Sequence, residues 1–104
     1  MLVAYEVSLD LIRELKVIVP VVAANDGEEA QQLKSAANSI VRNIAEGMKR
    51  RGKDPKRFYA YAAGSANEVR GVLDLADAWG WNADMSRARQ LTDRLVGLLW
   101  GLTR

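Results

Sequence analysis

Apolar residues recur at spacings of three and four along almost the whole chain, and this periodicity restricts its fold more than any other feature. Such spacing gathers apolar side chains on one face of an α-helix. Val7, Leu11, Leu15 and Ile18 show it in the first segment. Alternating β-branched runs and hairpin dipeptides, which would predict strands, are absent from the sequence. The pattern therefore predicts an all-α fold.

Three further segments have the same periodicity. Their stripes consist of Ala30, Leu33, Ala37, Ile40, Ile44 and Met48, then of Phe58, Ala62, Ser65, Val69, Val72, Ala76 and Trp79, and finally of Ala88, Leu91, Leu95, Leu98 and Leu102. Short connections between helices favour antiparallel neighbours. We therefore predict an antiparallel up-down-up-down four-helix bundle that forms a single domain over residues 1–104.

Local signals place the helix boundaries. Ser8 suits a cap of the first helix, and Pro20 predicts its end because proline lacks the backbone donor. Asp54 suits an N-cap before Pro55 at the first helical position, and Gly80 suits a left-handed stop after the third helix. The predicted helices span roughly 4–19, 27–50, 55–79 and 84–103.

The composition excludes several kinds of site. Without any Cys or His, the chain cannot form a disulfide, a thiolate zinc site or a Ser-His-Asp arrangement. It also lacks the commonest general base near neutral pH. We therefore expect no enzymatic activity, no catalytic residue, no cofactor and no metal.

Nothing in the sequence predicts a membrane protein. The apolar run "LVGLLWGL" near the C-terminus has 8 residues, whereas a membrane-spanning helix needs about 20. Glu6 and Asp10 interrupt the first residues, which lack the basic start and continuous apolar stretch of a signal peptide. We expect a cytoplasmic protein without membrane contact.

Positive charge is concentrated in one short segment. The net charge of the chain is +2, but residues 49–57 hold six basic side chains and one acidic one, for +5. Residues 1–48 hold four basic and seven acidic side chains, for −3, and residues 58–104 hold five of each. The segment "KRRGKDPKR" is therefore the candidate site for an acidic partner.

A polar motif lies among the apolar residues of the second and third segments. Ser39, Asn43 and Glu46 share one face of the second helix, and Ser65 and Glu68 share one face of the third. Buried polar groups have to pair with one another, so the motif predicts a structural network between these helices. The alternative is a carboxylate site of Glu46 and Glu68 for a divalent ion, although bundle sites of that kind usually also recruit His.

The third segment contains the small-residue run "YAAGSA", residues 61–66. Gly64 costs about 1 kcal/mol relative to alanine inside a helix, so a compensating contact is expected. Close approach of a neighbouring backbone, within the bundle or between subunits, is the predicted reason. A phosphate-cradling glycine loop does not fit, because no glycine-rich turn precedes a helix start here.

The motif "SI-x-x-NIAEG", residues 39–47, and the motif "GS-x-x-E", residues 64–68, resemble those of the four-helix-bundle proteins encoded in intervening sequences of bacterial 23S ribosomal RNA genes. That family is similar in turn to the accessory proteins of diversity-generating retroelements, which pair with a reverse transcriptase. The resemblance covers about half of the chain strongly. The arginine-rich approach to "SI" in that family is replaced here by "KSAAN", residues 34–38.

The resemblance implies a barrel-like homopentamer without established enzymatic activity. It also implies RNA, DNA, a reverse transcriptase or another protein as candidate partners. Trp81 and Trp100 are candidates for a subunit interface, where aromatic residues are enriched. In such a ring, five copies of the basic corner would form a collar of about +25, which attracts polyanions.

The leading hypothesis is a non-enzymatic oligomeric adaptor of a ribonucleoprotein that binds nucleic acid weakly and without sequence preference. Tyr59 lies off the predicted stripe and could stack on an unpaired base. The alternatives are a protein-interaction scaffold without a nucleic-acid role, or a merely solvated corner between helices. A hydrolase would need metal-dependent turnover that is lost in Glu46→Gln. The candidate binding residues are Lys49, Arg50, Arg51, Lys53, Lys56, Arg57 and Tyr59.

Overall fold

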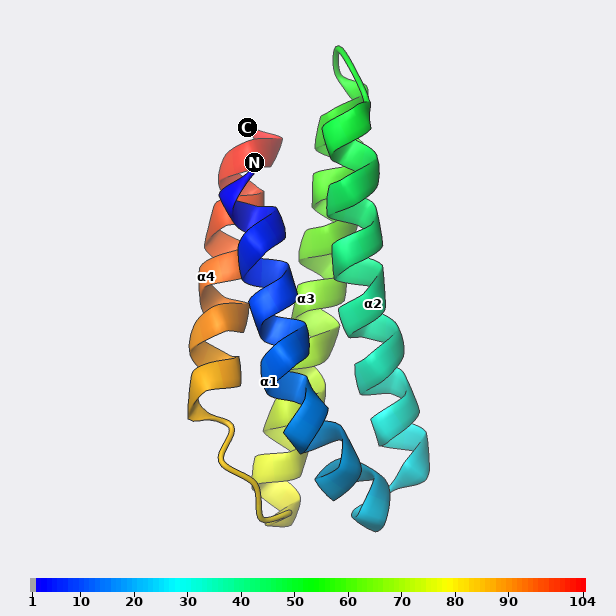
Figure 1. The fold of residues 1–104 in the computed structure, drawn as a ribbon, viewed down its shortest axis with the longest axis vertical. Coiled ribbons are helices and arrows are strands. Elements are labelled where there is room, and N and C mark those ends of the chain that lie inside the picture. The colour runs from blue at the N-terminus through cyan, green and yellow to red at the C-terminus, as the bar shows by residue number, and fades with distance from the viewer. Residues whose placement is uncertain (1) are drawn as a thin grey trace.

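The computed structural model describes residues 2–104, and this part of the chain forms four α-helices. They are α1 (Val3–Asn25), α2 (Gly27–Lys49), α3 (Asp54–Trp79) and α4 (Ser86–Thr103). Successive helices run in opposite directions, and α4 packs back against α1 to close the bundle (Figure 1). The molecule measures 44 × 22 × 19 Å. The predicted all-α four-helix bundle is confirmed.

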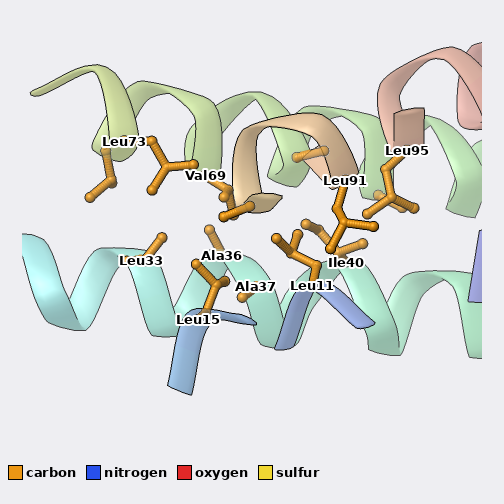
Figure 2. Packing of buried hydrophobic residues seen from close by; sticks show 14 of the residues in the cluster. Leu11, Leu15, Leu33, Ala36, Ala37, Ile40, Val69, Leu73, Leu91 and Leu95 are labelled. Atoms are coloured by element: carbon orange, nitrogen blue, oxygen red, sulfur yellow. The ribbon is translucent and has the colours of Figure 1, made fainter. Parts of the chain in front are cut away.

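One hydrophobic cluster fills the space between the helices, and all four contribute to it. Figure 2 shows Leu11 of α1, Ile40 of α2 and Leu91 of α4 pointing into the same space. The predicted stripe of α1 is buried, and most of the stripes on α2 and α4 are buried as well. None of the helices formed by residues 2–104 is both long and apolar enough to cross a bilayer.

The expected end of the first helix at Pro20 is wrong, because α1 continues to Asn25. Pro20 is exposed, whereas Val22 continues the inward stripe and is only 1% exposed. Burial of this further apolar side chain offsets the backbone hydrogen bond that proline cannot make. Ser8 is not a cap: it lies buried inside α1, and its hydroxyl donates to the backbone oxygen of Tyr5 at 2.6 Å.

A single residue, Asp26, connects α1 to α2. Its extended backbone (φ −156°) ends α1, and its N–H donates to the backbone oxygen of Val22 at 2.7 Å. Its side-chain Oδ1 accepts hydrogen bonds from the backbone N–H groups of Glu28 and Glu29, both at 3.1 Å. The same residue therefore terminates one helix and caps the next.

The inward stripe of α3 is displaced by one residue near its start, which corrects two expectations. Tyr59 is 8% exposed and occupies the position that was expected for Phe58, which is half-buried. At the other end Trp79 is 71% exposed, since the buried stripe stops at Ala76. Met48, at the end of the α2 stripe, is also exposed.

Gly47 explains why Tyr59 turns inward. A Cβ atom on Gly47 would lie 2.6 Å from Cε1 of Tyr59, so the tyrosine ring occupies the space that any other side chain would need. Gly64 shows the opposite, because a Cβ atom there would meet nothing within 4 Å. The expected close packing at Gly64 within the bundle is therefore wrong.

The turn from α3 to α4 begins at Gly80, whose φ of +77° favours glycine. The fourth helix begins at Ser86 rather than at residue 84. Asp84 precedes it, and its Oδ1 accepts hydrogen bonds from the Ser86 backbone N–H at 3.1 Å and hydroxyl at 2.7 Å. These hydrogen bonds favour the charged carboxylate and hold the pKa of Asp84 below its ordinary value.

Acid should abolish the contribution of Asp84 to stability. Because the pKa is lowered in the folded state, this contribution is fully present above the ordinary pKa of an aspartate. It is lost as pH falls through the lowered pKa. We expect Asp84→Ala to unfold at a lower urea concentration than the wild type at pH 7, with the difference vanishing in acid. A difference that stays the same as the pH is lowered would contradict this assignment.

Candidate functional site

The basic corner, residues 49–57, connects α2 to α3 at one end of the bundle. In Figure 1 it extends beyond the chain termini that mark the adjacent ends of α1 and α4. Lys49 is the last residue of α2. Asp54 was predicted as the N-cap of α3, but it is the first residue of that helix, and the N-cap position is occupied by Lys53. Gly52 turns the chain between them with a φ of +69°. The corner is therefore solvated on several sides.

Two of the six cations in the basic corner are held by carboxylates. Arg50 donates to Oε1 of Glu46 at 2.9 and 3.2 Å, and its Nη1 lies 3.6 Å from Oδ2 of Asp54. Arg57 lies 3.9 Å from Oδ1 of the same aspartate. Both guanidinium groups also lie 4.9 Å from the centroid of the Phe58 ring. These contacts orient both arginines at the base of the corner, although both side chains remain about half exposed.

The other four cations of the basic corner are exposed and form no ion pair within residues 2–104. They are Lys49, Arg51, Lys53 and Lys56. When Glu46 is added to the corner, six basic and two acidic side chains leave a local charge of +4. A positive charge on a projecting, solvated turn attracts polyanions. When its cations neutralise phosphates, the counterions condensed on the polyanion are released.

Tyr59 does not belong to this surface, which corrects the expected stacking role. It is buried, and burial raises the pKa of its hydroxyl above the ordinary value. Tyr61 is the exposed aromatic residue instead, at 53%. Its ring meets Phe58 edge to face, with 5.9 Å between the ring centroids. The sequence could have indicated Tyr61, because it follows Phe58 by one helical turn.

The predicted polar network between α2 and α3 forms only in part. The Ser65 hydroxyl donates to Oγ of Ser39 at 2.9 Å, and Nδ2 of Asn43 donates to Ser39 at Oγ and at the backbone oxygen. Glu46 instead pairs with Arg50, and Glu68 is exposed. The network therefore fixes the register of the two helices but does not include the carboxylates.

The structure does not bring Glu46 and Glu68 together as a metal site. Ser39 and Ser65 are in contact across antiparallel helices. Counting from that contact, the two glutamates lie on opposite sides of it and are about 15 Å apart along the bundle axis. No group of three or more acidic side chains within residues 2–104 is placed to hold a metal ion.

The family model described as 23S rRNA-intervening sequence protein matches residues 2–100 of the chain. The match includes all of α1, α2 and α3, the basic corner and most of α4. No curated protein and no solved structure matches the chain.

Proposed function

Because the chain belongs to the 23S rRNA-intervening sequence protein family, we propose that it is a non-enzymatic oligomeric adaptor of a cytoplasmic ribonucleoprotein. In this proposal the basic corner binds RNA or DNA weakly and without sequence preference. The observation that carries the proposal is the group of four exposed cations without ion pairs at the projecting α2–α3 turn.

The chemistry of the corner suits phosphate rather than base edges. Lysine and arginine side chains on a solvated turn contact phosphate oxygens, which carry no sequence information. The corner presents its cations on a turn and on the first residues of α3, rather than along a helix that could enter a major groove. The exposed ring of Tyr61 adds a surface on which an unpaired base can stack.

Oligomerisation would strengthen this weak contact. In a ring, every copy presents its corner at the same end, and neighbouring corners bind one strand together. Linked contacts then act at a high effective concentration, so that a few phosphate contacts per copy suffice. The adaptor would join the bound strand to a protein partner, for which a polymerase acting on nucleic acid is one candidate.

A protein-interaction scaffold is the second candidate, and exposed apolar residues favour it. Val3, Met48 and Trp100 are all more than 40% exposed. Contiguous apolar patches on a surface mark protein contacts, and aromatic residues such as Trp100 are enriched in them. In this alternative the basic corner docks an acidic protein surface, and nucleic-acid binding is absent.

Charge reversal at the corner tests the proposal. We expect Lys49→Glu/Arg51→Glu/Lys53→Glu to abolish binding of labelled single-stranded RNA, measured by fluorescence anisotropy across a salt series. The wild-type affinity should fall steeply with salt. Each phosphate contact on a single strand contributes about −0.7 to the slope of log affinity against log salt. Replacing the same residues by glutamine should therefore make the slope shallower by about 2.

A triple variant elsewhere on the surface provides the matched control. Arg13→Glu/Arg87→Glu/Arg94→Glu changes the net charge by the same amount and alters only exposed side chains on α1 and α4. It should retain most of the binding. If both triple variants lose binding equally, net charge and not the corner determines it. If the wild type does not bind at low salt, the scaffold alternative replaces the proposal.

A further inference from the structure

The exposed side of α3 has the spacing of a second helix-packing seam. Its residues follow one another at intervals of three and four, as in the apolar seam of a coiled coil. The seam consists of Tyr61, Gly64, Glu68, Gly71, Leu75 and Trp79. All six residues are exposed, including Tyr61 at 53%, Leu75 at 41% and Trp79 at 71%. One face of α3 therefore packs in the core of the protomer. The opposite face has the spacing of a packing seam, but no helix of the protomer covers it.

The two glycines of this seam are not required by packing within the protomer. A Cβ atom on Gly64 or on Gly71 would meet nothing within 4 Å. Each glycine costs about 1 kcal/mol relative to alanine in a helix interior. Both lie in the middle of a long helix with ordinary helical backbone angles. Close approach of another molecule to this face would offset that cost.

A groove on the outside of α1 and α2 provides a matching surface. It contains two adjoining hollows of about 240 and 330 Å³, and both are lined mainly by apolar side chains. The apolar lining comes from Leu9, Ile12, Leu15, Val19 and Pro20 of α1 and from Ala37 and Val41 of α2. From Leu9 to Pro20 the groove is about 16 Å long, whereas the seam from Tyr61 to Trp79 is about 27 Å long, so the groove accommodates the middle of the seam, from Gly64 to Leu75.

The charges of the two surfaces are complementary. The residues that line the groove include three cations, Lys16, Lys34 and Arg42, and no acidic side chain. None of the three forms an ion pair within residues 2–104. Glu68 is the only charged residue of the seam, and it is likewise without an ion pair there. A carboxylate in the middle of an otherwise apolar seam selects a partner that presents cations.

We propose that the α3 seam of one copy packs into the α1–α2 groove of a second copy, with Glu68 beside the groove cations. This proposal rests on the oligomer proposed above and identifies the two surfaces that build it. The two surfaces differ and lie on different sides of the bundle, with α3 behind α1 and α2 in Figure 1. One copy can therefore use both at once, and such a head-to-tail contact forms a ring when its rotation closes.

Two substitutions block one surface each without disturbing the core. Gly71→Leu places a bulky side chain on the seam, where a Cβ atom meets nothing. Asn38→Trp fills the groove from an exposed position that lines both hollows. We expect each variant to sediment as a monomer of 11.5 kDa, whereas the wild type sediments as an oligomer. Gln90→Leu, at an exposed position on α4, a helix that contributes to neither surface, should remain oligomeric.

Mixing the two blocked variants gives the sharpest result. Gly71→Leu retains a groove and Asn38→Trp retains a seam, so an equimolar mixture should form a complex of twice the chain mass and nothing larger. Circular dichroism verifies that each variant is folded. A wild type that sediments as a monomer, a Gly71→Leu variant that remains oligomeric, or a mixture without the two-chain complex would each overturn the proposal. Binding of RNA by a monomeric variant would show that the basic corner acts independently of this interface.

Discussion

Replacing Ile40 by alanine is expected to lower the free energy of unfolding by about 2–5 kcal/mol, the largest loss for any single truncation considered. Ile40 is 0% exposed and points into the cluster shared by the helices (Figure 2). Alanine removes three carbon atoms at that point, and the surrounding helices cannot close the gap completely. The loss is a large part of the 5–15 kcal/mol that stabilises a typical domain.

Urea unfolding followed by circular dichroism measures this loss. Ile40→Val removes one methylene group and should cost about 0.5–1.5 kcal/mol. Val17→Ala removes apolar atoms from a side chain that is 69% exposed, and it should change stability by less than about 0.5 kcal/mol. Equal effects at Ile40 and Val17 would show that the two positions are not buried as the structure has them.

Gly47→Ala is expected to destabilise the bundle by about 1–3 kcal/mol, although alanine favours a helix by about 1 kcal/mol over glycine. The added methyl group would lie 2.6 Å from the ring of Tyr59, which is buried and has little room to move. Gly97→Ala is the matched control, because nothing lies within 4 Å of its added methyl group. That substitution should stabilise the fold by up to about 1 kcal/mol.

A double-mutant cycle isolates this contact. Tyr59→Leu removes the ring atoms that face Gly47, so it should cost less in the Gly47→Ala background than in the wild type. Tyr59→Phe retains those ring atoms and should not relieve the overlap. If the free energies of Gly47→Ala and Tyr59→Leu simply add, the two residues do not compete for the same space.

The two sequence motifs separate into an inward and an outward part. Ser39, Ile40 and Gly47 of the first motif are explained by the packing of α2 within the protomer. Gly64 and Glu68 of the second motif lie on the outside of α3, where nothing in the protomer contacts the glycine. The first motif therefore serves packing within one chain. In the second motif Ser65 does the same through its hydrogen bond to Ser39, whereas Gly64 and Glu68 have no such contact within residues 2–104.

The sequence predicted the helices well because each stripe is long and regular. It could not distinguish Phe58 from Tyr59 as the inward residue, since both continue a helical face. The choice depends on the space that Gly47 leaves on α2. Pro20 misled the prediction for a similar reason: a local rule was outweighed by the burial of Val22, which is a tertiary effect.

The candidate site was predictable in composition but not in geometry. The sequence shows six cations in the corner, whereas the pairing of Arg50 and Arg57 with carboxylates depends on the fold of the turn. The α1–α2 groove left no recognisable pattern in the sequence. Its lining comes from two helices, and on each helix all but one of the residues lie beside the core stripe; the exceptions are Leu15 and Ala37.

The one-residue connection at Asp26 links the rotational phase of α1 to that of α2. Each residue of an α-helix turns the chain by about 100°, and Asp26 has no neighbouring loop residue that could absorb such a rotation. Insertion or deletion of one residue there would turn the apolar stripe of one helix out of the core. The connection 80–85 has six residues whose backbone angles can adjust to such a change. A change in helix length is therefore accommodated more easily at the α3–α4 turn than at Asp26.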